Sequence, residues 1–116
     1  MRLERITAGL LGACGVAAAA ASAHGGDQRL MGAVALICLT HAPAILALSA
    51  IGRSRLVAVA IVLLFSGAAV FSADLALRAL DAARLFPLAA PTGGLAMIAG
   101  WLLTAASGLF NVRQSH

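Results

Sequence analysis

Four long apolar stretches dominate this chain, and each approaches or exceeds the ~17–25 residues that a helix needs to cross a bilayer. They cover residues 6–23, 30–51, 56–73 with an extension towards 80, and 93–110. The composition agrees, because 62% of the residues are hydrophobic and only 10% are charged, far less charge than a soluble domain carries. The spans and their short connections use nearly the whole sequence, which predicts a single integral membrane domain over residues 1–116.

The spans are predicted to be helices and not barrel strands. A membrane strand alternates apolar and polar residues over about ten positions, whereas these runs are apolar on every face. Helix-breaking residues fall between the spans: Gly25 and Gly26 after the first, Gly52 after the second, and Pro87 and Pro91 around the third connection. We therefore expect an all-α membrane protein, a four-transmembrane-helix bundle, since a helix satisfies its own backbone in lipid.

The arginines predict an orientation in the membrane. Five lie at span ends on the side of the N-terminus and three on the opposite side, and basic residues near span ends favour the cytoplasm. The first group is Arg2, Arg5, Arg53, Arg55 and Arg113, and the second is Arg29, Arg78 and Arg84. Both termini are therefore predicted to be cytoplasmic. The net charge of +4 does not indicate a nucleic-acid partner, because the basic residues are scattered singly or in pairs along the chain.

The N-terminal segment also has features of a secretory signal peptide. Arg2 and Arg5 precede an apolar stretch, and the small residues Ala21 and Ala23 flank Ser22 in a pattern that a signal peptidase could cleave. We expect the segment to be retained as the first span.

Small residues recur at four-residue spacing on two spans, with Gly12 beside the first series. The series are Gly9, Ala13, Ala17 and Ala21 in the first span and Gly100, Thr104 and Gly108 in the fourth. Such faces let helix backbones approach closely where lipid supplies no hydrophobic driving force. We expect them to pack helices within the bundle, with contacts in a homo-oligomer or a larger membrane complex as the alternative.

Polar side chains inside the spans are the candidates for function. His41 lies near the centre of the second span, where ionisable residues are rare and usually face the protein interior. Counting along antiparallel spans places Cys14, Ser66 and Trp101 at a similar depth, with Thr104 within a turn. We predict that His41 is neutral, points into the bundle and bonds to a hydroxyl or carbonyl of another span, with Ser66 as the best candidate. A proton or solute pathway and a metal or haem ligand are the alternatives.

The spacing of Cys38 and His41 allows a metal site to be considered, because residues three apart share a helix face. Cys14 could approach from the first span, and a soft ion such as copper(I) accepts such ligands. No CxxC, HExxH or paired-histidine motif accompanies them. We therefore predict no metal site, no cofactor and no catalytic residue.

Charged and polar residues gather at the edge of the membrane opposite the termini. Asp74 and Arg78 are spaced for a helical ion pair, and so are Arg78 and Asp81. A shielded Asp74 would need Arg78 or His24 as its partner, because a buried charge is costly without one.

Four segments in sequence order carry a resemblance that covers nearly the whole chain. They are Gly-Leu-Leu-Gly-Ala at 9–13 with Ala-His-Gly at 23–25, His-Ala at 41–42, Leu-Phe-Ser-Gly at 64–67, and Ala-Pro-Thr-Gly-Gly at 90–94 leading to Ala-Gly-Trp-Leu at 99–102. In these segments the chain resembles the YgdD-like and transmembrane protein 256-like family of small four-span proteins, a domain of unknown function. It departs from the family at Cys38, where members often have another polar residue. The resemblance implies a multi-pass protein of the bacterial inner (plasma) membrane without an established biochemical activity.

The leading hypothesis is a non-enzymatic membrane protein that acts through helix–helix contacts, as an accessory or scaffolding subunit or as a homo-oligomer in the lipid bilayer. The alternative is a small transporter or channel that uses the polar group around His41. An enzyme is the third hypothesis. General acid–base catalysis at His41 would need a second titratable residue, and none is predicted at the same depth in the membrane.

Overall fold

Four helices make up the computed structural model, which describes residues 2–51 and 54–114, with side chains as far as Phe110. They are α1 (Arg2–Ala23), α2 (Gln28–Ala50), α3 (Arg55–Ala79) and α4 (Ala89–Gln114). All four are long and apolar enough to cross a membrane. The predicted all-α, four-helix bundle is therefore confirmed.

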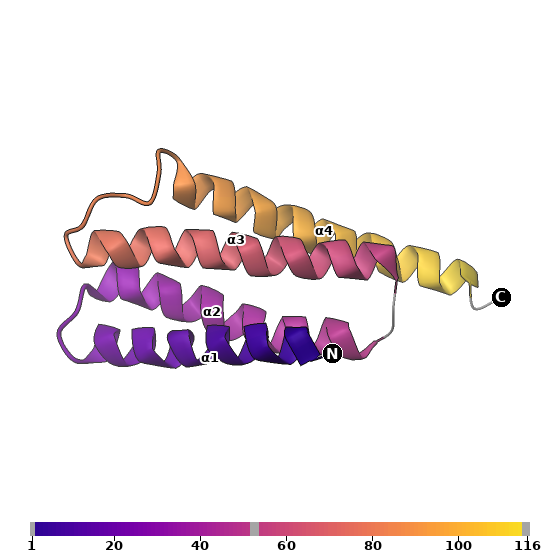
Figure 1. The fold of residues 1–116 in the computed structure, drawn as a ribbon, viewed down its shortest axis with the longest axis horizontal. Helices are drawn as coiled ribbons and strands as arrows, with labels where there is room; N and C mark the ends of the chain where they lie inside the picture. Colours follow the sequence, from indigo (N-terminus) through magenta and orange to yellow (C-terminus); the bar gives the residue numbers. More distant parts are fainter. Residues whose placement is uncertain (1, 52–53, 115–116) are drawn as a thin grey trace.

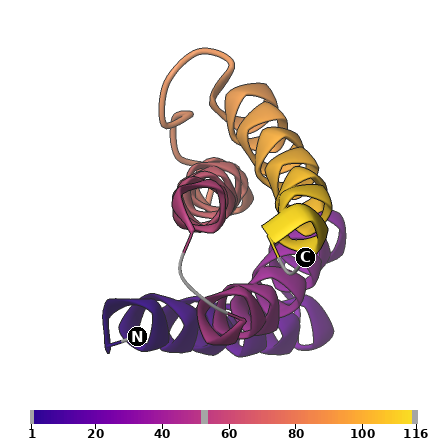
Figure 2. The same ribbon diagram turned by 90° about the vertical axis from the view of Figure 1, so that its right-hand side faces the viewer.

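The helices run antiparallel, and each packs extensively against the next in the sequence: α1 on α2, α2 on α3 and α3 on α4 (Figure 1). The end-on view in Figure 2 places α1 and α4 on opposite sides, with α2 and α3 between them. The α1–α2 and α3–α4 loops lie at one end of the bundle, and α1 begins and α4 ends at the other. This arrangement matches the prediction that both termini face the same side of the membrane. Of the residues used for that prediction, Arg53 and the side chain of Arg113 lie outside the described residues. Gly52, predicted to break the chain after the second span, lies outside them as well.

Short polar caps define the starts of two helices. The side chain of Asp27 accepts a hydrogen bond from the Leu30 N–H (3.0 Å), and the hydroxyl of Ser54 accepts one from the Val57 N–H (3.1 Å). Each bond satisfies a donor that the first helical turn leaves free and contributes about 1 kcal/mol. Gly25, with φ +113°, makes the turn after α1 that the sequence predicts.

The fourth helix begins four residues earlier than predicted. Its first residue is Ala89, so Pro91 lies inside the first turn and not in the connection. A proline is tolerated there because the first N–H groups of a helix have no intrahelical acceptor. The hydroxyl of Thr92 donates to the Leu88 carbonyl (2.8 Å).

α3 and α4 approach each other closely at two glycines. A Cβ atom on Gly67 would lie 2.6 Å from the carbonyl oxygen of Gly93, and one on Gly93 would lie 2.7 Å from the carbonyl oxygen of Gly67. Real Cβ atoms do not approach other atoms so closely. Because glycine has no Cβ atom, the two helices can approach this closely at Gly67 and Gly93.

Candidate functional site

His41 lies on the inner face of α2 and is 6% exposed, so the prediction that it points into the bundle is confirmed. The indole N–H of Trp101 donates to its Nε2 over 3.1 Å, and its Nδ1 lies 2.8 Å from the carbonyl oxygen of Ile37. The two rings meet edge to face, with centroids 5.7 Å apart and planes at 69°. Because an indole nitrogen only donates, Nε2 accepts and Nδ1 carries the proton. This hydrogen-bond pattern corresponds to the neutral ring.

The prediction that Ser66 is the partner of His41 is wrong. Ser66 is exposed on α3, and its hydroxyl donates to the carbonyl of Val62 in its own helix (2.7 Å). The bond to another span comes instead from Trp101, and the carbonyl partner, Ile37, belongs to the histidine's own helix. Matching depth along the membrane normal fixes the height of a residue but not its direction around the helix axis. A serine that faces outward satisfies its hydroxyl on its own backbone.

The other midplane residues do not join this pair. The half-buried Thr104 donates to the carbonyl of Gly100 (2.9 Å), again within one helix, and Cys14 is exposed on α1. Of the residues predicted to form a polar core, the structure joins only His41 and Trp101 by a hydrogen bond.

A second polar pair, Cys38 and Ser72, links α2 to α3. The sulfur of Cys38 lies 3.3 Å from the hydroxyl oxygen of Ser72, and both side chains are buried. The sequence analysis missed Ser72, although its spacing of four residues from Ala68 and eight from Leu64 places it on the buried stripe of α3. Among the described residues, no three His, Cys, Asp or Glu side chains lie where they could hold a metal ion together.

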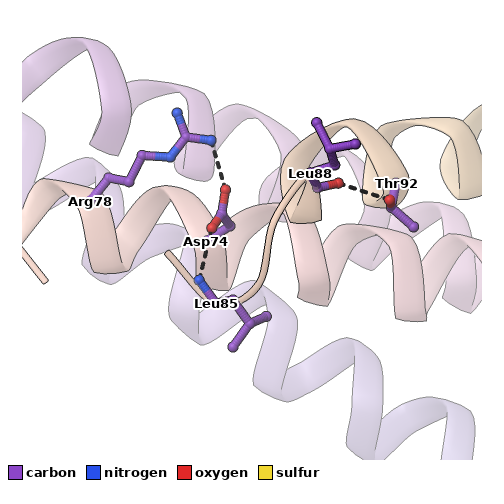
Figure 3. A network of polar contacts seen from close by, with 5 residues as sticks. All are labelled: Asp74, Arg78, Leu85, Leu88 and Thr92. Carbon is purple, nitrogen blue, oxygen red and sulfur yellow. Dashed lines mark hydrogen bonds and ion pairs between the residues drawn. The ribbon is translucent and has the colours of Figure 1, made fainter. Parts of the chain in front are cut away.

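Asp74 organises the end of the bundle opposite the termini (Figure 3). Its side chain is buried, and one carboxylate oxygen accepts a hydrogen bond from Arg78 at 2.6 Å. The other accepts the backbone N–H of Leu85 at 3.0 Å. Of the two partners considered from the sequence, Arg78 is the one that binds, and His24 is exposed. The carboxylate therefore fastens the α3–α4 loop to the end of α3.

The four glycines predicted to pack helices divide into two groups. A Cβ atom on Gly100 would lie 2.9 Å from the side chain of Leu64, and one on Gly12 would make ordinary contact with Ala42 at 3.7 Å. Among the described residues, Gly9 and Gly108 have no atom within 4 Å of that position, so neither packs against another described helix. The prediction of internal packing is wrong for these two.

The face of α1 that packs on α2 is not the predicted stripe. Its buried residues are Ala8, Leu11, Gly15 and Ala18, and a Cβ atom on Gly15 would lie 2.7 Å from the side chain of Leu39. The predicted stripe is rotated away from α2, because successive residues on a helix point about 100° apart.

A cleft runs between α1 and α3, with α2 at its base, and we name it the α1–α3 cleft. It has a volume of about 430 Å³ and is open along one side. Its walls include Cys14 and Ala17 of α1, Met31 and Cys38 of α2, and Phe65 and Ala73 of α3. A smaller cavity of about 260 Å³ continues along the same two helices towards the termini, and Phe65 borders both.

Comparison with known families identifies the chain. A search of curated proteins and a search of solved structures give no match. A family model described as protein of unknown function (DUF423) matches residues 11–94, which include α2, α3 and most of α1. The chain therefore belongs to the DUF423 family of proteins of unknown function.

Proposed function

We propose that this protein is a non-enzymatic, multi-pass component of the bacterial inner membrane that acts by packing its helices against other membrane helices. The partner is a second copy of the chain or a larger complex in which the protein is an accessory or scaffolding subunit. Both termini lie in the cytoplasm in this proposal.

The observation that carries the proposal is the outward face of α1. This helix packs extensively only on α2, and the side turned away carries Gly9, Ala13 and Ala20, all exposed. The same face of α1 also carries Ile6 and Val16, which are 52% and 62% exposed, so the small residues alternate with large ones there, whereas the outward face of α4 carries Leu95 and Leu102, 67% and 66% exposed. Large apolar side chains suit contact with lipid, whereas small ones allow another helix backbone to approach.

The surroundings of His41 do not favour transport or catalysis. Both ring nitrogens bond within the protein, and His41 lines neither the α1–α3 cleft nor the cavity that continues it. A proton or solute pathway would need a water-accessible route to the ring. The hydroxyl nearest the ring belongs to Thr40, 3.2 Å from Nδ1, and it is not a titratable partner. We therefore do not propose a transporter, a channel or an enzyme.

The test is the mass of the protein extracted in mild detergent and measured natively. Wild-type protein is expected as an oligomer or bound to a second protein, and Gly9→Leu and Ala13→Leu should shift it to a monomer because they fill the face of α1. Gly108→Leu is the matched control on α4, where a side chain also meets open space, and it should leave the association unchanged. A strictly monomeric wild-type protein with no bound partner would refute the proposal.

The membrane orientation has its own test. Fusions of a reporter that fluoresces only in the cytoplasm, placed after the C-terminus and in the α3–α4 loop, should be bright at the first position and dark at the second. The reverse pattern would show that the arginine distribution does not set the orientation of this chain.

A further inference from the structure

We propose that the second half of the α3–α4 loop, residues 84–88, inserts into the lipid leaflet at the end of the bundle opposite the termini, with Arg84 bound to phospholipid phosphates. We name these residues the returning segment, because the loop turns back along α3 (Figure 1). α4 begins further in along the bundle than the level at which α1 and α3 end. The connection between these two spans is therefore not simply a loop that stands in water.

Contacts with α3 fix the height of the returning segment. The N–H of Leu85 donates to Asp74 over 3.0 Å, and Asp74 lies about 7.5 Å along the helix axis before the end of α3. Phe86 reaches further and lines a small hollow between α3 and α4 together with Val70. Since the apolar run of this span ends at residue 73, Phe86 lies at the boundary of the hydrocarbon layer and not beyond it.

The side chains of the returning segment suit this height. Leu85, Phe86 and Leu88 are 44%, 41% and 65% exposed. A turn closed by the Ala89 N–H on the Phe86 carbonyl (3.1 Å) places Leu88 third, with φ +63°, at a position where glycine usually supplies the positive φ. A large apolar side chain is therefore held outward where the backbone conformation favours a residue without one.

The backbone of the returning segment also tolerates the edge of the hydrocarbon. Irregular backbone is costly there, because lipid offers no partner for N–H groups. Pro87 has no N–H to satisfy, the N–H of Leu85 is bonded to a carboxylate, and that of Ala89 closes the turn. Three of the five positions from 85 to 89 therefore present no free donor to lipid.

Arg84 precedes the apolar residues and lies on the water side of them. It is exposed and forms no ion pair with any described residue, whereas Arg78 is bonded to Asp74. An arginine at this level lays its aliphatic stem along apolar surface and extends its guanidinium to phosphate oxygens. A soluble protein as the occupant would need the apolar side chains to stand clear of the bilayer, and their height excludes that arrangement.

Tryptophan fluorescence measures the depth of the segment. Trp101→Phe removes the single tryptophan, and Phe86→Trp or Ala82→Trp then adds one within the segment or before it. Ala82 is also exposed, but its N–H bonds to the Leu77 carbonyl near the end of α3. In phosphatidylcholine vesicles, lipids brominated on the acyl chain should quench position 86 more than position 82, and aqueous iodide should do the reverse. Equal quenching of the two positions by the brominated lipids would refute the insertion.

The unmodified chain provides a measurement that does not depend on whether these variants fold. Leu80 and Leu88 are both exposed, by 76% and 65%, but Leu80 follows the end of α3. Hydroxyl radicals generated in water should oxidise Leu80 and spare Leu88 in phospholipid nanodiscs. Oxidation of both would contradict the insertion. Protection of Leu88 without acyl-chain quenching at position 86 would also overturn it, because a second copy would then cover the segment.

A substitution at Arg84 tests the contact with phosphate. Arg84→Gln should reduce the acyl-chain quenching at position 86 in vesicles, and Arg84→Lys should retain it. Arg29→Gln is the matched control, since Arg29 is exposed at the same end of the bundle on α2, and it should have no effect. In dodecyl maltoside micelles, which contain no phosphate, Arg84→Gln should leave the tryptophan emission unchanged. An equal change in vesicles and micelles would show that Arg84 acts within the protein and would overturn the assignment to lipid phosphate.

Discussion

Replacement of Gly67 by alanine should open the α3–α4 crossing. The new Cβ atom would lie 2.6 Å from the carbonyl oxygen of Gly93 and 2.8 Å from the Met97 side chain, whereas ordinary contact begins at 3.4 Å. The backbones must therefore separate by roughly 0.8 Å, and a gap of about 0.5–1 Å forfeits a quarter to a half of the dispersion energy of each contact. We expect the free energy of unfolding to fall by about 1–3 kcal/mol, the usual cost of overpacking. This loss exceeds the gain of up to ~1 kcal/mol that alanine brings over glycine in a helix.

The assay is unfolding by titration of a mild detergent with sodium dodecyl sulfate, followed by the fluorescence of Trp101, the single tryptophan. Gly94→Ala is the matched control, because a Cβ atom there has no neighbour within 4 Å, and it should not destabilise the protein. Gly67→Ala and Gly93→Ala together should cost less than the sum of the two, since one separation of the helices relieves both clashes. If Gly67→Ala and Gly94→Ala had equal effects, the close crossing would be refuted.

Three further predictions concern the polar side chains. His41→Leu and Trp101→Phe should each lower the free energy of unfolding by about 0.6 kcal/mol, the average for hydrogen bonds between membrane helices, and by no more than about 1.7 kcal/mol. Unfolding is followed here by circular dichroism, because Trp101→Phe removes the single tryptophan. The double variant should cost less than the sum of the two, and additive losses would argue against the bond. Asp74→Asn should speed hydrogen exchange at the α3–α4 loop amide that the carboxylate binds, and unchanged exchange there would show that the loop is held by other contacts. A small maleimide should react with Cys38 only after denaturation, and reaction of Cys38 in the folded protein would contradict its burial.

The number and places of the helices could be predicted because bilayer thickness imposes a length on each apolar run. The helix ends were less predictable. α1 begins at Arg2, four residues before the apolar run, because a helix can continue past the hydrocarbon layer into charged residues. The sequence pattern predicts a break at Pro91, but the first turn of α4 accommodates it at no cost in hydrogen bonds.

The candidate site was less predictable, because sequence counting gives depth but not direction around the helix axis. Ser66 and Ser72 are the same residue type on the same helix, six positions apart, and therefore point about 120° away from each other. One faces outward and bonds to its own helix, and the other faces α2 and meets Cys38. The bond from Asp74 to the N–H of Leu85 had no sequence signal, since every residue type other than proline offers the same backbone donor.

The small residues show why spacing alone does not reveal which contacts a helix makes. The close crossing of α3 and α4 uses single glycines, Gly67 and Gly93, because two crossing helices need small residues only where their backbones are nearest. A repeated series such as Gly9 and Ala13 extends close approach over more than one turn, yet this series faces away from the bundle. If internal packing were its role, the series would lie where Ala8 and the other buried residues of α1 lie. Its outward direction is therefore the feature that a contact with a helix outside the chain would explain, and Gly9→Leu is the variant that tests this explanation directly.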